Sequence, residues 1–299
     1  MEKVGFIGLG DIGAPMAERI ALAGLDLTVW NRTAEKMTPL VDAGAKAAAS
    51  AREIGETCDL VCICLDSVAA VEEVVFGPAG LTSPDCRMTL LVDHATLPSV
   101  VSQGFDTRLS KLGIGYLDAP VSGGAIGARA GTLAVMVGGD TGLVDRARPI
   151  LASFGSRISH MGAVGTGQAT KACNQILNFG NVATLAEALL LGRRYGLAPV
   201  TLTQAIEGGF AASVVSREYR RSLEAGDFSP IRFLTEVLIQ VYDGESPEDL
   251  EGKLEVLMKD LDIALSMAGK TNSPLPVLSH FHRQFEPLHL GKPLQPIKT

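Results

Sequence analysis

The sequence predicts an α/β protein in which a doubly wound, mostly parallel β-sheet is followed by an all-helical domain. Up to about residue 162, short apolar runs alternate with segments of helical periodicity, which is the pattern of successive βα units. Beyond that point the periodicity is helical and no strand pattern appears. Glycines between Gly162 and Gly167 mark the joint, so we expect a first domain of residues 1–163 and a second of residues 164–299 that begins with a long interdomain helix.

Each element of this fold follows from its local pattern. Strands are expected at Val4–Leu9, Leu27–Trp30, Leu60–Leu65, Thr89–Asp93, Gly115–Asp118 and Leu133–Val137. Helices between and after them are expected at about Gly13–Ala23, Ala34–Ala43, Ser67–Val75, Pro98–Leu112 and Gly142–Ala152. The second half is expected to contain helices at about Gly167–Tyr195, Pro199–Gly208, Ser213–Ala225, Ile231–Asp243, Pro247–Ala268 and Val277–Phe285, followed by a loose tail from Pro287 to Thr299. Ligands of such sheets bind at the carboxyl ends of the strands, which directs attention to Leu9, Trp30, Leu65, Asp93 and Asp118.

The turn after the first strand has the sequence pattern of a dinucleotide-binding turn. It reads Gly8-Leu9-Gly10-Asp11-Ile12-Gly13, a G-x-G-x-x-G between an apolar run and an amphipathic segment. Gly8 allows the tight reversal, Gly10 lets the backbone approach a pyrophosphate, and Gly13 lets the helix pack close to the strand. The free N–H groups at the start of the helix favour an anion. This pattern predicts a Rossmann-type domain that binds NAD or NADP, although a glycine-rich turn in another α/β protein remains an alternative.

The end of the second strand bears on which nucleotide is bound. Asn31-Arg32-Thr33 follows Trp30, and an acidic residue that would bind the ribose 2′-hydroxyl of NAD is missing there. The guanidinium of Arg32 suits a 2′-phosphate, and its neighbours add neutral hydrogen-bonding groups. The pattern favours NADP(H), with NAD still possible. The alternative is that Arg32 is a solvated surface residue and Asn31 a helix cap.

Composition and charge exclude several other classes of function. The 299 residues are 46% apolar and 20% charged with a net charge of −7, and no basic stripe suited to nucleic acid is present. The most apolar long stretch, Ile176–Leu191, contains Asn178, Asn181 and Glu187, so we expect a buried helix rather than a membrane span. Five cysteines without a C-x-x-C pair, and a chain that begins directly with a strand, predict reduced thiols and a cytoplasmic protein. The five histidines form no cluster with cysteines or carboxylates, so no metal is expected.

Two segments carry the candidate chemistry. Ser122, Gly123 and Gly124 follow a strand, and a hydroxyl with exposed N–H groups can hold a carboxylate, although a plain turn would look similar. On the long helix, Lys171, Asn174, Gln175 and Asn178 lie at i, i+3, i+4 and i+7 and therefore share one face.

A polar face on an otherwise apolar helix needs partners or a wet cavity, and a cavity at a domain junction is a natural substrate site. Within such a site Lys171 can give a proton to an alkoxide or take one from a hydroxyl, and partial burial would lower its pKa towards the working range. The alternative is a solvent-exposed first turn with Lys171 in water.

Taken together, these segments resemble the β-hydroxyacid dehydrogenase family, which includes 3-hydroxyisobutyrate dehydrogenase, tartronate semialdehyde reductase (2-hydroxy-3-oxopropionate reductase) and glyoxylate/succinic semialdehyde reductase. The resemblance rests on GFIGLGDIGAPMA, VWNRT, LDAPVSGGAIGARAGTLAVMVGGD, GTGQATKACNQ and MKDLDIALSMA, and extends from Val4 to about Pro230 before resuming at Lys259. It implies a nucleotide domain, a long interdomain helix and a helical domain, in a homodimer or homotetramer. It also implies interconversion of a small aldehyde acid and its β-hydroxyacid.

The resemblance also implies roles for individual residues. Lys171 matches the catalytic lysine, and Ser122, Gly123 and Gly124 match the loop that holds the substrate carboxylate. The same comparison places Asn174 and Gln175 against the substrate and Leu65, Asp66, Thr96 and Lys259 against the cofactor. Asn174-Gln175, with Glu207–Ser213, is most similar to tartronate semialdehyde reductase, whereas Asn31-Arg32-Thr33 is similar to the NADPH-using semialdehyde reductases.

Three departures from the family pattern bear on the choice of substrate. Ala95 stands where serine is common before Thr96, the segment Val237–Leu257 is longer than expected by about twenty residues, and the tail lacks the usual ending. An imine reductase on the same architecture is the alternative enzyme, and Lys171 counts against it. A decarboxylating phosphogluconate dehydrogenase fits less well because the expected His-Asn is missing after the lysine. A non-catalytic NADPH-binding module that recognises a partner protein is the alternative outside enzymes.

Overall fold

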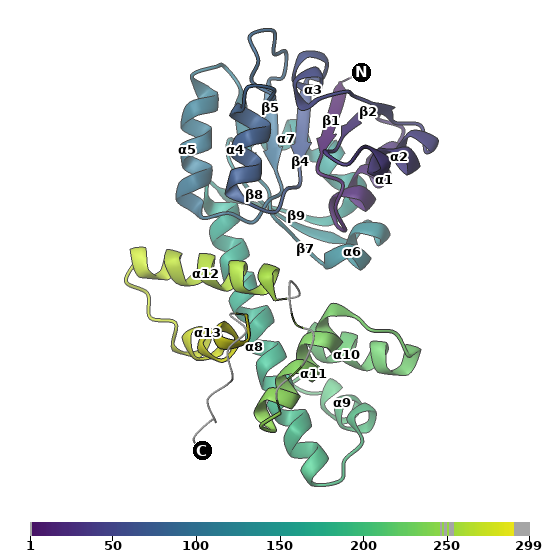
Figure 1. Cartoon of the computed structure of the whole chain (residues 1–299), viewed down its shortest axis with the longest axis vertical. Helices are drawn as coiled ribbons and strands as arrows, with labels where there is room; N and C mark the ends of the chain where they lie inside the picture. The colour runs from purple at the N-terminus through teal and green to yellow at the C-terminus, as the bar shows by residue number, and fades with distance from the viewer. Residues whose placement is uncertain (1, 246, 248–249, 251–253, 290–299) are drawn as a thin grey trace. The chain divides into compact units, whose positions relative to one another are not determined.

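The computed structural model describes residues 2–245, 247, 250 and 254–289. The chain divides into two compact units, residues 1–171 and 172–299, and the division falls inside the long helix α8 (Thr166–Arg194). Figure 1 shows the first unit as a sheet covered by helices and the second as helices alone.

The first unit is built on one sheet whose strand order reverses at its centre. Its strands are β1 (Lys3–Ile7), β2 (Asp26–Trp30), β3 (Lys46–Ala47), β4 (Leu60–Ile63), β5 (Leu90–Asp93), β6 (Gly115–Asp118), β7 (Val121–Ser122), β8 (Leu133–Gly138) and β9 (Gly155–Gly162). They are ordered β3-β2-β1-β4-β5-β6-β8-β7, with β9 also paired to β8. The pairs from β3 to β6 are parallel, and β8 runs antiparallel to β6 and β7. The predicted Rossmann-type, mostly parallel sheet is therefore confirmed.

Helices cover both faces of this sheet. They are α1 (Gly13–Leu22), the 3₁₀ helix η1 (Ala34–Met37), α2 (Thr38–Asp42), α3 (Ala51–Thr57), α4 (Val68–Phe76), α5 (Ser99–Ser110), α6 (Gly124–Ala130) and α7 (Thr141–Phe154). One apolar core joins the sheet to α1, α6 and α7, and a second joins it to α3, α4 and α5. Alternate residues of a strand feed the two cores, as Phe6 and Ile7 of β1 do. This arrangement leaves the carboxyl ends of the strands as the edge where a ligand can bind.

The structure differs from the sequence-based expectation where local patterns are weak. The sequence does not predict β3, β7, α3, α6 or β9. The side chains of β9 are mostly exposed, so this edge strand lacks the apolar run that marks a strand. The helix expected at Ala34–Ala43 is instead a 3₁₀ turn followed by the short α2, since Pro39 lies within that segment.

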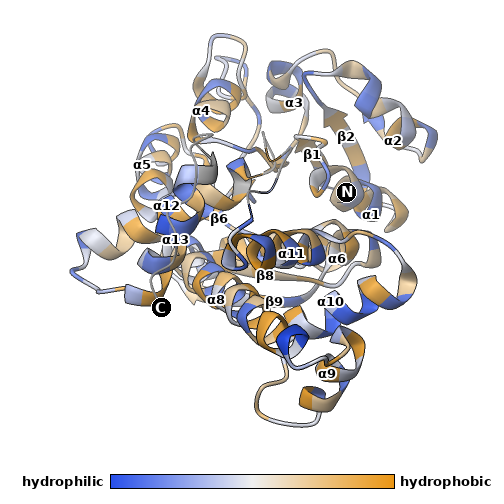
Figure 2. Cartoon of the chain, turned by 60° about the horizontal axis from the view of Figure 1, so that its bottom comes forward, coloured by the Kyte–Doolittle hydropathy of each residue, from blue (hydrophilic) through white to orange (hydrophobic). Residues whose placement is uncertain are grey.

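All the regular secondary structure in the described part of the second unit is helical. Besides most of α8 it contains α9 (Pro199–Glu207), α10 (Val214–Ala225), α11 (Pro230–Tyr242), α12 (Glu255–Lys270) and α13 (Pro276–His289). Hydrophilic and hydrophobic residues alternate along α8 (Figure 2), and its apolar side chains join those of α10 to α13 in one core. The expected all-helical second domain is confirmed, but the helix expected from Pro247 begins at Glu255, because Pro247 and Leu250 are not helical.

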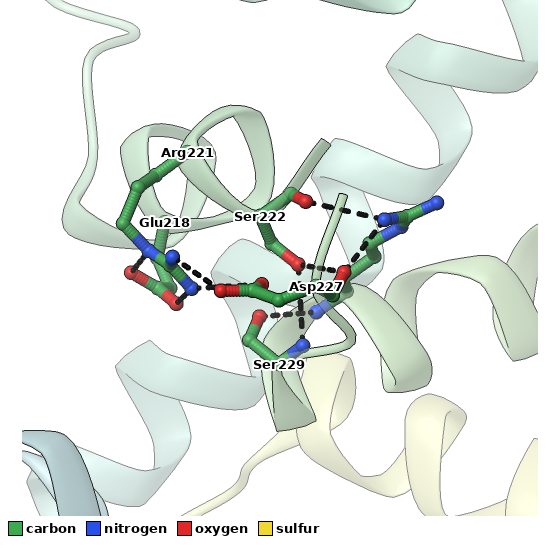
Figure 3. Close-up of polar contacts among 6 residues, drawn as sticks. Glu218, Arg221, Ser222, Asp227 and Ser229 are labelled. Carbon is green, nitrogen blue, oxygen red and sulfur yellow. Dashed lines mark hydrogen bonds and ion pairs between the residues drawn. The ribbon is translucent and has the colours of Figure 1, made fainter. Parts of the chain in front are cut away.

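A set of polar contacts fixes the turn between α10 and α11 (Figure 3). The buried Ser222 hydroxyl donates to the Asp227 carbonyl oxygen at 2.8 Å and accepts from the Ser229 amide at 3.2 Å. Arg221 forms ion pairs with Glu218 at 2.7 Å and with Asp227 at 2.6 Å. The turn is thereby held by the buried hydrogen bonds of Ser222 and by the exposed ion pairs of Arg221.

Part of the predicted insertion Val237–Leu257, and the tail after His289, lie outside the described residues. Within the insertion, Asp243 pairs with Arg194, the last residue of α8. Across the described portion of the chain, no helix combines the length and apolar character needed to cross a membrane.

Candidate active site

The glycine-rich turn between β1 and α1 has the geometry that a pyrophosphate requires. Gly8 has a φ of +95°, a backbone conformation that would be strained in a residue with a side chain. A Cβ at Gly13 would lie 1.9 Å from the Gly8 carbonyl oxygen. At Gly10, in contrast, nothing in the described chain lies within 4 Å of the position a Cβ would take. Gly10 thus faces open space directly before the start of α1, where the positive end of the helix dipole favours an anion. The turn fits a dinucleotide.

The other predicted nucleotide-contacting residues lie at neighbouring strand ends. Asn31, Arg32 and Thr33 follow β2, Leu65 and Asp66 follow β4, and Thr96 follows β5. Because β2 and β4 flank β1 on opposite sides, these ends gather where the strand order reverses.

The side chain of Asn31 has a structural task in this arrangement. Its Oδ1 accepts from the Leu9 amide at 3.0 Å, and its Nδ2 donates to the Thr33 carbonyl at 3.0 Å. Asn31 therefore ties the turn after β1 to the turn after β2. Arg32 and Thr33 are exposed beside it.

Two buried carboxyl groups end the central strands β5 and β6. Asp93 accepts from the Ala95 amide and the Tyr116 hydroxyl, both at 2.9 Å, and burial raises its pKa to about 7. Burial also raises the pKa of Asp118 to about 6, against hydrogen bonds that favour its charged form. Its two oxygens accept from the amides of Gly165 and Gln168, each at 2.8 Å. Asp118 thereby anchors the start of α8 to the end of β6.

This anchor holds the predicted catalytic lysine beside the predicted carboxylate loop. Lys171 is 8% exposed, and its Nζ donates to the Val121 carbonyl oxygen at 2.9 Å. Val121 directly precedes Ser122, Gly123 and Gly124, where φ values of +134° and +60° at the two glycines turn the backbone into α6. The alternative of a solvated Lys171 on an exposed first turn is wrong, because that turn packs against the ends of β6 and β8. A Cβ at Gly167 would lie 2.5 Å from the carbonyl oxygens of both Asp118 and Met136.

The remaining predicted substrate and cofactor residues belong to the second unit. Gln175 is 7% exposed, and its Nε2 donates to Asp260 at 2.5 Å. Its Oε1 accepts from Asn174 at 3.1 Å. Lys259 lies 3.7 Å from the other Asp260 oxygen. Since a carboxylate only accepts, Asp260 fixes which way the Gln175 amide faces, and Gln175 in turn fixes Asn174.

Sequence reasoning assigned no role to Gln168 or Asp260, although both are buried polar residues. Gln168 is 1% exposed and precedes Lys171 by one helical turn, and that spacing was the available signal. His94 is also buried, and its Nδ1 lies 2.7 Å from the Ala119 carbonyl oxygen, so Nδ1 carries the hydrogen. Burial lowers the pKa of His94 to about 4, which makes this ring neutral and structural.

Within the described residues, no group of three or more histidine, cysteine, aspartate or glutamate side chains is placed to hold a metal ion. The cysteines at positions 58, 62, 64, 86 and 173 are free thiols. In the first unit, the Lys171 ammonium, the Ser122 hydroxyl and the main-chain amides after it suit proton transfer and carboxylate binding.

Comparison with known proteins shows the family to which the chain belongs. Residues 3–162 match the NAD binding domain of 6-phosphogluconate dehydrogenase, and residues 165–239 match the family described as NAD-binding of NADP-dependent 3-hydroxyisobutyrate dehydrogenase. The chain is 38% identical over 230 residues to 2-hydroxy-3-oxopropionate reductase of Escherichia coli K12, covering 76% of this chain and 78% of that one. It is 32% identical over 285 residues to 2-(hydroxymethyl)glutarate dehydrogenase of Eubacterium barkeri, covering 95% and 88%.

A solved structure agrees over nearly the whole chain. The crystal structure of 3-hydroxyisobutyrate dehydrogenase from Salmonella typhimurium superposes with a TM-score of 0.78 at 25% identity, over 99% of this chain and 97% of that one. The chain is therefore an NAD(P)-dependent oxidoreductase of the β-hydroxyacid dehydrogenase family.

Proposed function

We propose that this enzyme interconverts a small aldehyde acid and the corresponding 3-hydroxy acid, with Lys171 as the group that moves the proton. One observation carries the proposal: the buried ammonium of Lys171 lies 2.9 Å from the carbonyl oxygen of Val121, the residue before Ser122. A proton donor is thus fixed next to a loop that can hold a carboxylate.

The chain's own groups divide the reaction between them. The hydroxyl of Ser122 and the amides of Gly123 and Gly124 bind the substrate carboxylate. This leaves the C3 carbonyl of the substrate facing Lys171. A bound nicotinamide supplies the hydride in reduction and accepts it in oxidation. Lys171 gives a proton to the carbonyl oxygen in reduction and removes it from the hydroxyl in the reverse direction. Asn174 and Gln175, oriented by Asp260, support the position of that oxygen.

The substrate class is suggested by what the relatives' names have in common. Reduced 2-hydroxy-3-oxopropionate, 3-hydroxyisobutyrate and 2-(hydroxymethyl)glutarate all contain a CH₂OH group on the carbon that bears the carboxylate. They differ only in the other group on that carbon. We propose the same 3-hydroxypropanoate core for this enzyme.

NADP(H) is proposed as the preferred cofactor. The exposed Arg32 at the end of β2 can pair with a 2′-phosphate, whereas the Asn31 amide is already bound to the main chain. Lys259 is proposed to approach the nicotinamide, and a homodimer or homotetramer stays a prediction that light scattering can check.

The proposal is tested with initial rates on a panel of aldehyde acids that share the carboxylate and vary the group on C2. Rates are measured with NADPH and NADH, for wild-type enzyme and for Arg32→Ala. We expect turnover of several panel members, a higher kcat/KM with NADPH, and loss of that preference in Arg32→Ala. Matched aldehydes without the carboxylate should react at least tenfold more slowly. Equal rates on the acids and the carboxylate-free aldehydes would contradict the proposed role of the loop.

A further inference from the structure

We propose that Gln168 is a positioning residue that locks the helix carrying Lys171 to the turn carrying Thr96. The inference rests on the proposed function of these two residues, one in proton transfer and one in cofactor binding. In this proposal Gln168 holds Lys171 and Thr96 at a fixed relative position without itself contacting substrate or cofactor.

The side chain of Gln168 bridges the main chain on both sides of Thr96. Its Oε1 accepts from the Leu97 amide at 3.0 Å, and its Nε2 donates to the Ala95 carbonyl oxygen at 2.8 Å. Because an amide N–H can only donate and a carbonyl oxygen can only accept, these partners fix the orientation of the carboxamide. The two bonds define the shape of the Ala95–Leu97 turn.

The main chain of Gln168 belongs to a second set of contacts. Its amide donates to Asp118 at 2.8 Å, which joins the first turn of α8 to the end of β6. Lys171 follows three residues later, on the same side of the helix, and donates to Val121 at 2.9 Å. The start of α8 is thus bonded to the turn after β5 through the side chain of Gln168. It is also bonded to the end of β6 through Asp118, and to β7 through Lys171.

Simple space filling does not explain a glutamine at this place. The side chain is 1% exposed, and an apolar residue of similar size would avoid the cost of burying an amide. Both of its hydrogen bonds reach main-chain atoms more than seventy residues away, rather than atoms of its own helix. The carboxamide therefore transmits the position of the Thr96 turn to the helix that carries Lys171.

The test replaces Gln168 by leucine, which is of similar size and forms neither bond. We expect Kd for NADPH, measured by nicotinamide fluorescence, to rise about tenfold, and kcat to fall about tenfold, because two main-chain groups lose their partners. Gln103→Leu is the matched control: Gln103 Nε2 also donates to a carbonyl, that of Val164 at 3.4 Å, but its side chain is exposed. Its Kd and kcat should stay at wild-type values.

A second control separates positioning from stability. Val75→Ala opens a cavity in the core beneath α4 and should lower Tm without changing Kd or kcat well below that temperature. If Gln168→Leu behaves like Val75→Ala, with a lower Tm but wild-type Kd and kcat, the inference is wrong.

Gln168→Met serves if the leucine variant does not fold. It keeps the length of the side chain and forms neither of the two hydrogen bonds, so a similar rise in Kd for NADPH is expected, and a wild-type Kd would again contradict the inference. Failure of the proposed function would look different. Lys171→Met would then keep ordinary turnover, while the NADPH affinity of Gln168→Leu would still be reduced.

Discussion

Two glycines of the same turn should respond to alanine in opposite ways. At Gly13 the added Cβ would lie 1.9 Å from the Gly8 carbonyl oxygen and 3.2 Å from the Cys64 Cβ. Ordinary contacts begin near 3.4 Å, so the backbone must move by about 1.5 Å, which we expect to cost about 3 kcal/mol. For a unit of this size, that corresponds to a loss of about 6–12 °C in Tm.

At Gly10 the added methyl group meets nothing in the described chain within 4 Å, so the folded protein should be unaffected or slightly stabilised. The same methyl would occupy the space proposed for the pyrophosphate, and Kd for NADPH should rise at least tenfold, or about 1.4 kcal/mol. The assay is a thermal melt without nucleotide, together with a fluorescence titration with NADPH. Wild-type affinity in Gly10→Ala, or equal losses of Tm in the two variants, would refute this account of the turn.

Two further predictions concern buried polar groups. Ser222→Ala removes a donor to Asp227 and an acceptor for Ser229, so urea unfolding should show a loss of about 1–3 kcal/mol. Arg221→Ala breaks only exposed ion pairs and should lose less stability; equal losses would contradict this. Burial raises the pKa of Asp93 from 3.8 to about 7, so the native state holds this proton more tightly than the unfolded state. The resulting stabilisation is complete below about pH 4 and is lost as the pH rises through about 7, and Asp93→Asn should flatten the slope of the free energy of unfolding over that range.

The parts of the fold that were predictable have local signals. The strand, turn and helix around Gly8–Gly13 follow one another within a short stretch, and each glycine has a steric reason visible in that stretch. The burial of Lys171 was predicted from the same kind of signal, since polar side chains at helical spacing on an apolar helix need partners. These inferences depend on contacts near in sequence.

The parts that were not predictable depend on distant partners or on weak patterns. Nothing near Gln168 indicates that it bonds to Ala95 and Leu97, because those residues are brought to it only by the order of the strands. Asn31 was predicted as a nucleotide ligand, yet the structure also gives it a bond to the Leu9 amide that the sequence does not reveal. Strand β9 was not predicted because most of its side chains are exposed, so it has no apolar run. Its place in the sheet depends on main-chain pairing with β8.

The proton-transfer role of Lys171 is the claim on which the proposed function depends, and the most direct test is the hydride-transfer rate of Lys171→Met in single turnover. Methionine keeps the length of the side chain and removes the ammonium. We predict a rate lower by about 10²- to 10⁴-fold, with Kd for NADPH within about twofold of wild type. A variant that reduces its aldehyde acid at the wild-type rate would contradict the account.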